Sequence, residues 1–186
     1  YKEDQHYGEK FIATRDYYRN KIDPNITAQE REEWQTAQLY YEFQVDPRVG
    51  YYQCYARWDE EVIKTHEVDA DMRLRDEGLR FMNRYTSQDS DFKAIRVRAS
   101  VNRDDIDRDC AVRWVKRYVS RGEMNKASQV AEAIRNSKES VFNWDAVEDP
   151  LYKAGLLTAW GESLVYTADK QTEAFAILRE AIQILN

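Results

Sequence analysis

The sequence predicts an all-α fold of stacked antiparallel helical hairpins, preceded by a helical extension at the N-terminus. Three observations lead to this fold class. The 186 residues include only 6 glycines and 3 prolines, and so few helix breakers favour long helices. Apolar residues recur at helical spacing, and strand-like alternation of any length is absent from the sequence. Charged residues make up 33% of the chain, which is typical of proteins with water-exposed helix surfaces.

Residues 1–46 form the predicted helical extension. Residues 3–20 are expected to be helical, because apolar and aromatic side chains recur every three or four residues. Pro24 ends this pattern, since it pushes the preceding aspartate out of the helical conformation. Thr27 and Glu30 then form a capping box, which predicts that a second helix starts here.

Residues 47–186 form the predicted hairpin domain, which starts with Asp46 as N-cap and Pro47 at the first helical position. An aromatic stripe at helical spacing follows and is expected in the core: Tyr51, Tyr55, Trp58 and Val62. Further helices are expected over 69–85 and, in shorter form, over 90–97. A stronger helix runs from Asn102 to Arg121, with acidic residues near its start and basic residues near its end, as the helix dipole favours.

Two segments of the second half have the residue spacing of a helix–turn–helix unit. The first contains Trp114, Tyr118, Gly122, Ala127, Ala131 and Ile134. The second contains Trp160, Gly161, Leu164, Ala174, Leu178 and Ala181, and its apolar face is widened by Ile177, Ile182 and Leu185. Gly122 is expected to supply a left-handed turn, and small residues such as Ala127 and Gly161 let the paired helices approach closely.

This placement of glycine and alanine resembles the tetratricopeptide-like class of helical repeats, which implies a TPR-like superhelix that serves as a binding scaffold. Ala127 and Ala174 lie 47 residues apart, against the ~34 of a regular tetratricopeptide repeat. The segment 167–169 stands where the family has its turn glycine, and no proline closes the second unit. Residues 136–152, which include Asp149 and Pro150, are expected to form a loop with a short helix inside.

The sequence contains no recognisable constellation for catalysis or metal binding, so we expect a non-enzymatic protein without a cofactor. The acidic run 104–109 lacks the glycine and glutamate of an EF-hand loop and is interpreted as the acidic start of a helix. His6 and His66 are the only histidines, and nothing places His66 beside Cys54 or Cys110 for nucleophilic catalysis. Both cysteines are expected to be buried thiols, and no small-molecule site is evident.

Arginine and aromatic side chains are the candidates for binding a partner. The candidate residues are Arg113, Arg117, Arg121, Tyr51, Tyr52 and Trp144. The three arginines line one helix face, and such a face could bind RNA by charge and by stacking of bases on neighbouring aromatic rings. Because the net charge is −6, a solvated face paired with carboxylates is the favoured interpretation. The 13 tyrosines and 5 tryptophans favour a protein interface, where these residues are enriched.

A second resemblance involves five segments in a fixed order: 55–62, 69–70, 74–79, 111–117 and 127–134. Their order is similar to that of cytochrome c oxidase subunit Va, a peripheral helical subunit of the mitochondrial enzyme (subunit VI in fungi). That family has an Ala-Arg-aromatic helix, a Leu-Arg-x-Gly helix and an Ala-Leu-Arg helix. The chain departs from this pattern by one extra residue inside Leu-Arg-x-Gly, by added residues around 88–102 and by its N-terminal extension.

The resemblance implies a non-catalytic subunit on the matrix side of the inner mitochondrial membrane, with no metal of its own. The start at Tyr1 would then follow removal of a transit peptide. The leading prediction is a non-catalytic accessory subunit of a larger protein assembly, with a mitochondrial respiratory complex as the specific expectation. Its partners would be other protein subunits, and no apolar run approaches the ~20 residues of a membrane span. The alternative is an RNA-binding helical-repeat protein that uses the region Arg96–Arg121, and a chain outside mitochondria is expected to be soluble and intracellular.

Overall fold

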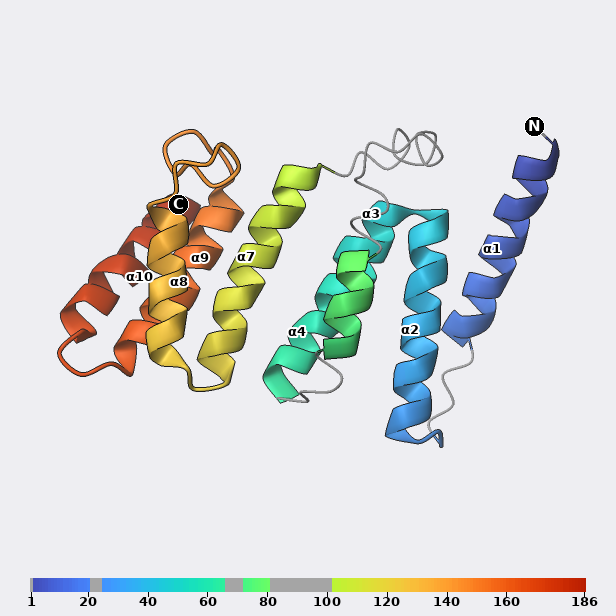
Figure 1. Ribbon diagram of the computed structural model, residues 1–186, viewed down its shortest axis with the longest axis horizontal. Helices are drawn as coiled ribbons and strands as arrows, with labels where there is room; N and C mark the ends of the chain where they lie inside the picture. Colours follow the sequence, from blue (N-terminus) through green and yellow to red (C-terminus); the bar gives the residue numbers. More distant parts are fainter. Residues whose placement is uncertain (1, 21–24, 66–71, 81–101) are drawn as a thin grey trace. The chain divides into compact units, whose positions relative to one another are not determined.

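Helices are the regular secondary structure throughout the part of the chain that the computed structural model describes, namely residues 2–20, 25–65, 72–80 and 102–186. These residues contain no strand, which confirms the all-α fold class (Figure 1). The helices are α1 (Lys2–Asn20), α2 (Ala28–Val45), α3 (Pro47–Val49), the π-helix η1 (Gly50–Tyr55), α4 (Ala56–Thr65), α7 (Arg103–Ser120), α8 (Met124–Arg135), α9 (Pro150–Val165) and α10 (Gln171–Leu185). Residues 72–80 are also helical. The short helix predicted for 90–97 lies outside the described residues.

The chain divides into two compact units, residues 1–101 and residues 102–186. This division differs from the predicted boundary between residues 46 and 47. The physical reason is that α2 and η1 share one core, in which Leu39, Phe43 and Tyr51 are all fully buried. The helix of the predicted extension therefore belongs to the same unit as the segment that follows it.

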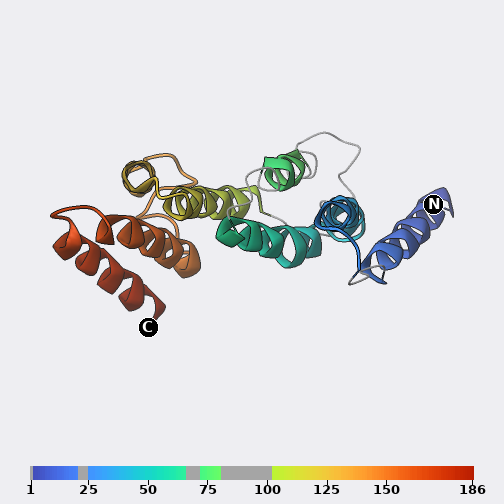
Figure 2. The same ribbon diagram turned by 90° about the horizontal axis from the view of Figure 1, so that it is seen from below.

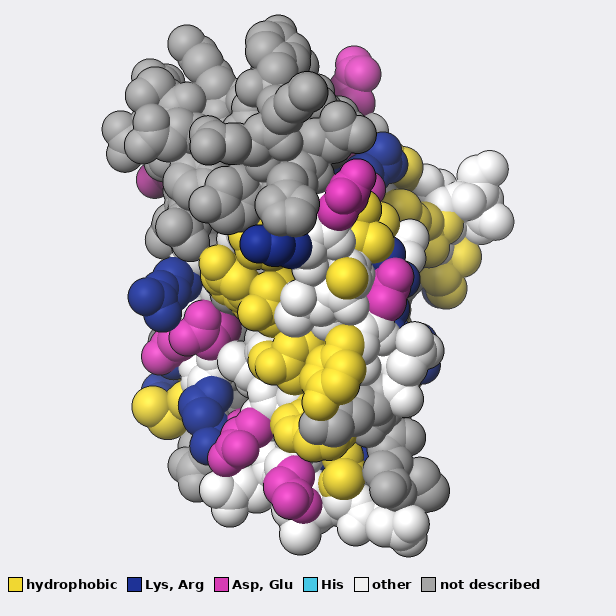
Figure 3. Space-filling view, turned by 90° about the vertical axis from the view of Figure 1, so that its right-hand side faces the viewer, with side chains coloured by type: hydrophobic (Ala, Val, Ile, Leu, Met, Phe, Trp, Pro, Cys, Tyr) yellow, Lys and Arg dark blue, Asp and Glu magenta, His cyan; other side chains and the backbone are white. Residues whose placement is uncertain are grey.

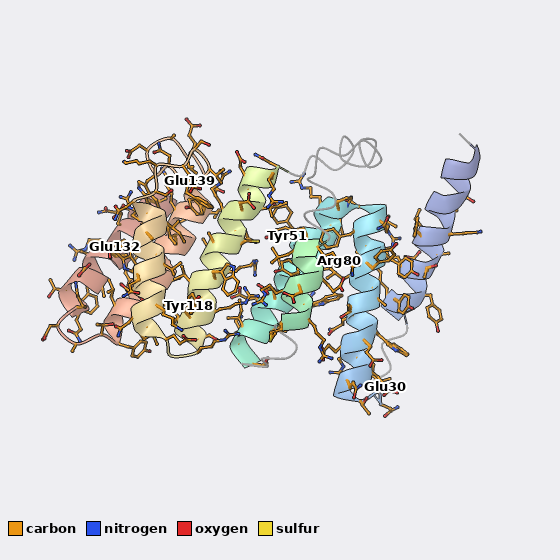
Figure 4. All side chains as sticks on the ribbon, in the orientation of Figure 1. Glu30, Tyr51, Arg80, Tyr118, Glu132 and Glu139 are labelled. Carbon is orange, nitrogen blue, oxygen red and sulfur yellow. The ribbon has the colours of Figure 1, made fainter. Side chains whose placement is uncertain are left out.

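The first unit begins with two paired helices, α1 and α2. Thr27 accepts a hydrogen bond from the Glu30 amide, and the Glu30 carboxylate accepts one from the Thr27 amide at 2.9 Å, so the predicted capping box is confirmed (Figure 4). The hydrogen bonds from Thr27 hold the pKa of Glu30 below its usual value. Arg19 of α1 forms a bidentate ion pair with Glu42 of α2, whose side chain is buried. Because a buried carboxylate without a partner is costly, this ion pair fixes α1 against α2.

The second unit consists of two antiparallel hairpins, α7–α8 and α9–α10. Helix α9 packs against both helices of the first hairpin, and α10 packs mainly against α9 (Figures 1 and 2). Small residues lie at the helix crossings, since Ala127 and Ala174 are completely buried. Gly161 is also buried, and a Cβ atom there would lie 2.6 Å from the side chain of Leu178. The predicted close-approach positions are thus confirmed.

The two hairpins share one local register of 47 residues. Asn102 and Asp149 are the N-caps of α7 and α9. Asn102 accepts a hydrogen bond from one amide of the first turn, and Asp149 accepts from two. Gly122 and Asp169 both adopt positive φ, at 72° and 60°, in the turns between the paired helices. The left-handed turn predicted at Gly122 is confirmed, and an aspartate takes the same conformation in the second hairpin.

The segment between the hairpins differs from its prediction in two ways. The loop ends at Asp149, because this residue and Pro150 start α9 instead of lying inside a loop. Residues 136–149 form turns and contain no helix. The expected short helix is therefore absent from this fully described segment, whose turn hydrogen bonds, such as Phe142 to the Glu139 carbonyl, already satisfy part of its backbone.

Candidate protein-binding surface

The three arginines predicted to bind a partner lie on α7 or at its end, yet they do not form an open basic face. Arg113 forms an ion pair with Asp109 at 2.8 Å and is mostly covered. Arg117 is buried, and its guanidinium lies 5.6 Å from the centre of the Trp114 ring. Arg121 is exposed at the C-cap of the helix. Only one of the three therefore presents its side chain to solvent.

The acidic run at the start of α7 is engaged with arginines. Asp107 pairs with Arg103 at 2.9 Å, and Asp105 pairs with Arg108. These are contacts between residues three or four apart, as expected for neighbours on a helix surface. Within the described ranges, no group of three or more histidine, cysteine or carboxylate side chains is arranged to hold a metal ion. The acidic start of a helix is the interpretation that these contacts support.

The predicted aromatic candidates occupy different environments. Tyr51, labelled in Figure 4, is fully buried in the core of the first unit. Its neighbour Tyr52 is exposed. Trp144 is buried in the loop between α8 and α9. The guanidinium of Arg135 lies 3.7 Å from the centre of the Trp144 ring, and the ammonium of Lys153 lies 5.3 Å from it. Trp144 thus anchors the loop to both flanking helices, and neither it nor Tyr51 is available to a partner in this structure.

The two cysteines do not form a reactive site. Cys54 is buried, as predicted, and burial raises the pKa of its thiol to about 11, with the Glu42 carboxylate acting in the same direction. A thiol with a raised pKa is a poor nucleophile near neutral pH. Cys110, on α7, is half-buried, which differs from the prediction of a buried thiol.

A cleft between α2, α4 and the helix at residues 72–80 is lined by both polar and apolar side chains. Arg73 and Glu32 face each other across its wall and form an ion pair at 2.7 Å. Trp58 is half-buried at the same place. The charged groups on this wall neutralise each other, and no convergent set of polar groups marks the cleft as a ligand site.

Hydrophobic side chains gather on the side of the first unit that faces the viewer in Figure 3. Among the side chains of α1 that the structure describes, the large exposed hydrophobic ones are Ile12 and Tyr17. Two partly exposed apolar side chains are normal on a protein surface. The C-terminal hairpin of the second unit has more large exposed hydrophobic residues than the described part of α1.

The surface of interest is the side of the C-terminal hairpin that faces away from α7 and α8, which we call the outer face. Its residues are Leu151, Thr158, Glu162 and Val165 of α9, and Phe175, Arg179, Ile182 and Leu185 of α10. All eight are exposed. Within each helix they are three, four or seven residues apart, so they share one side of that helix. Figure 2 shows α10 at the edge of the second unit, with no described helix of this unit beyond it.

The apolar side chains of α10 on the outer face are largely uncovered. Phe175 is 65% exposed, Ile182 62% and Leu185 59%. The adjoining side of α10 is buried through Ala174, Ile177 and Ala181. Apolar residues therefore cover about half of the circumference of α10, but the neighbouring helices bury only part of them.

The shared register explains why these positions matter. Phe175 and Ile182 of α10 lie 47 residues after Ser128 and Arg135 of α8. In the first hairpin both equivalent residues contact the second hairpin. Ser128 accepts a hydrogen bond from the indole of Trp160 at 3.2 Å, and Arg135 forms an ion pair with Glu180 at 3.3 Å. Phe175 and Ile182 thus occupy positions that join one hairpin to the next, and they are exposed.

The sequence analysis identified two apolar residues of the outer face but did not predict that they form an exposed surface. It assigned Ile182 and Leu185 to a widened apolar face of the second hairpin and made no statement about what covers them. The signal that could have identified them is the width of the apolar arc on α10, which exceeds what one partner helix can bury. Phe175 was not singled out, because it lies beyond the small residues that define the hairpin.

Comparisons with protein-family models, with curated proteins and with solved structures found no match to this chain. The described helices include none that combines the length and the apolar character needed to cross a membrane. The structure and its chemistry therefore provide the basis for assigning a function.

Proposed function

We propose that this chain is a non-catalytic helical protein that binds another protein chain through the outer face of its C-terminal hairpin. The observation that carries this proposal is the exposure of Phe175 and Ile182 at positions where the preceding hairpin is joined to the next. Aromatic and large aliphatic side chains are the usual centres of protein interfaces. Large apolar side chains that lie together and exposed on one side of a helical hairpin are typical of a surface that binds another protein.

The charges of the outer face favour a protein partner over RNA. The face carries one acid, Glu162, and one base, Arg179, among apolar side chains. Nucleic-acid binding depends on an excess of lysine and arginine that neutralises phosphates. The RNA alternative uses the region Arg96–Arg121, of which residues 96–101 lie outside the described part of the chain. In the described part, Arg103, Arg108 and Arg113 are paired with aspartates. No observation on the described residues favours RNA over protein.

The finer proposal is that the assembly is a mitochondrial respiratory complex. It is supported by the similarity of segments such as 55–62 and 111–117 to the subunit Va family. In the described structure the first of these segments lies in η1 and α4, and the second lies in α7. Both segments are helical, as the family pattern requires. A mitochondrial location on the matrix side belongs to this same proposal.

Site-specific photo-crosslinking tests the binding proposal. A photoreactive amino acid replaces Ile182 in the complete chain, and the control replaces Ala176, which is exposed on the same helix about 120° away. We expect a protein adduct from position 182 at several times the yield of position 176, with the captured chain identified by mass spectrometry. Equal yields at both positions, or no protein adduct at position 182, would contradict the proposal.

A further inference from the structure

The outer face is complementary to itself, and we propose that its occupant is a second copy of this chain, so that two C-terminal hairpins pack face to face as a four-helix bundle. This inference rests on the proposed function and names the partner. It depends on three features of the hairpin: the distribution of charges, the level of each residue along the helices and the apolar area.

The charges of the outer face are few and opposite. Glu162 lies on α9 and Arg179 on α10, and neither has an ion-pair partner among the residues that the structure describes. The other acids of α10 lie on its flanks and are engaged, since Glu173 pairs with Lys170 at 2.6 Å and Glu180 pairs with Arg135. A partner surface must therefore offer one base opposite Glu162 and one acid opposite Arg179.

The level of these two residues along the hairpin is set by the contact between Gly161 and Leu178. Glu162 and Arg179 each lie one residue beyond this contact, on antiparallel helices. They are consequently within a few ångströms of the same height, because each helical residue rises about 1.5 Å. The same antiparallel register brings Val165 near the height of Phe175 and Leu151 near the height of Leu185.

A two-fold axis parallel to the helices would place residues of equal height opposite each other in the two copies. Such an axis sets α9 of one copy opposite α10 of the other and leaves every residue at its own height. Glu162 then faces Arg179 of the second copy, and the symmetry repeats this ion pair. Ile182 projects toward the smaller side chain of Thr158. A perpendicular axis through the middle of α10 would instead bring two copies of Arg179 together, which is unfavourable.

The apolar area fits an interface of modest size. The face contains five large apolar side chains: Leu151, Val165, Phe175, Ile182 and Leu185. An aromatic side chain can bury about 150–250 Å² and an aliphatic one less, so the exposed fractions of these five residues amount to roughly 400–500 Å² per copy. The polar residues between and beside them bring the face toward the ~800 Å² per partner of a standard protein interface.

Sedimentation equilibrium of the complete chain tests this inference. We expect a dimer whose dissociation constant rises at least tenfold in Glu162→Arg and at least tenfold in Arg179→Glu, because each change creates two like-charge contacts in the symmetric interface. The double variant, in which the charges are exchanged, is expected to return to within about threefold of the original value, since its ion pairs are restored. The control Ala176→Glu adds a charge to the same helix outside the face and is expected to leave the constant unchanged.

Other outcomes separate this inference from the proposed function. A monomer at micromolar concentrations overturns the second copy as occupant, as does a dimer that neither single variant weakens. If the monomeric chain still gives a protein adduct at position 182 that is not the chain itself, the proposed function stands and only its partner has been misassigned. If position 182 captures nothing and the chain is monomeric, both are wrong. Far-UV circular dichroism of each variant establishes that its helices are intact.

Discussion

Adding one methyl group at Gly161 is expected to destabilise the second unit, although the same change elsewhere on α9 is expected to stabilise it. A Cβ atom at Gly161 would lie 2.6 Å from two carbons of Leu178, which is closer than real contacts allow. At Gly155 the nearest atom, on Val112, is 3.4 Å away, an ordinary van der Waals distance. Gly155→Ala is thus a matched control on the same helix.

The magnitude follows from two opposing terms. Replacing glycine by alanine inside a helix stabilises by roughly 0.5–1 kcal/mol, because the unfolded chain loses conformational freedom. Overpacking a close helix contact costs about 1–3 kcal/mol. Gly161→Ala is therefore expected to lower the free energy of unfolding by about 1 kcal/mol, whereas Gly155→Ala raises it by roughly 0.5–1 kcal/mol. The helix propensity term cancels in the difference, which isolates the packing term.

Urea unfolding followed by far-UV circular dichroism measures both variants. The addition of Leu178→Ala to Gly161→Ala supplies a double-mutant cycle, and we expect a coupling energy of at least ~0.5 kcal/mol because the two residues are in contact. If Gly161→Ala stabilised the chain as much as Gly155→Ala, or if the cycle showed no coupling, the close packing of α9 on α10 would be refuted.

The remaining predictions concern caps, turns and one thiol. Asp149→Ala removes the N-cap of α9 and should lower the free energy of unfolding by about 1 kcal/mol in urea titrations. Asp169→Gly should raise it by roughly 0.5–1 kcal/mol and Gly122→Ala should lower it by a similar amount, because both positions have positive φ. Cys54 should react with iodoacetamide more slowly than Cys110 at pH 8, and comparable rates would contradict its burial. Since burial raises the pKa of the Cys54 thiol from 9.0 to about 11, its contribution to stability is present below pH 9 and lost as the pH rises through that window. Cys54→Ala should flatten the decline, as thermal unfolding at several pH values would show.

Helix starts were the most predictable feature of this sequence, because a cap is a hydrogen bond between residues two or three apart. The capping box at Thr27 and the caps at Asp46 and Asn102 are all found where the sequence indicates them. Asp149 followed by Pro150 carries the same signal as Asp46 followed by Pro47, yet it was assigned to a loop. The capping signal of Asp149 and Pro150 was sufficient to predict the start of α9, but these residues were interpreted as part of the loop between the hairpins.

Burial was harder to predict, because it depends on the phase of the helix and on what packs against it. Tyr51 and Tyr52 were grouped as partner-binding residues, but one is fully buried and the other is exposed. They lie in η1, a π-helix that follows the short helix α3. A π-helix rotates the following side chains relative to an α-helical register. The helical spacing of the aromatic stripe nevertheless predicted that Tyr51 and Tyr55 are buried, as they are. Trp58 and Val62, the other members of the stripe, are half-buried.

The sequence predicts the apolar residues of the outer face but not their exposure. A comparison of the outer face with the contact between the two hairpins explains the difference. The contact between the two hairpins is partly polar, because Ser128 accepts a hydrogen bond from Trp160 and Arg135 pairs with Glu180. Such contacts require accurate placement of both partners. In the interface proposed for the outer face, Phe175 and Ile182 would have no such requirement and would contribute through the exclusion of water. Burying a side chain of this size is worth about 1.5–3 kcal/mol, so a glutamate at position 182 would both forfeit that gain and place a charge in the interface. Sequence spacing reveals that a helix has more apolar surface than its own hairpin needs, but only the structure shows which part remains uncovered and at which height its two charges lie.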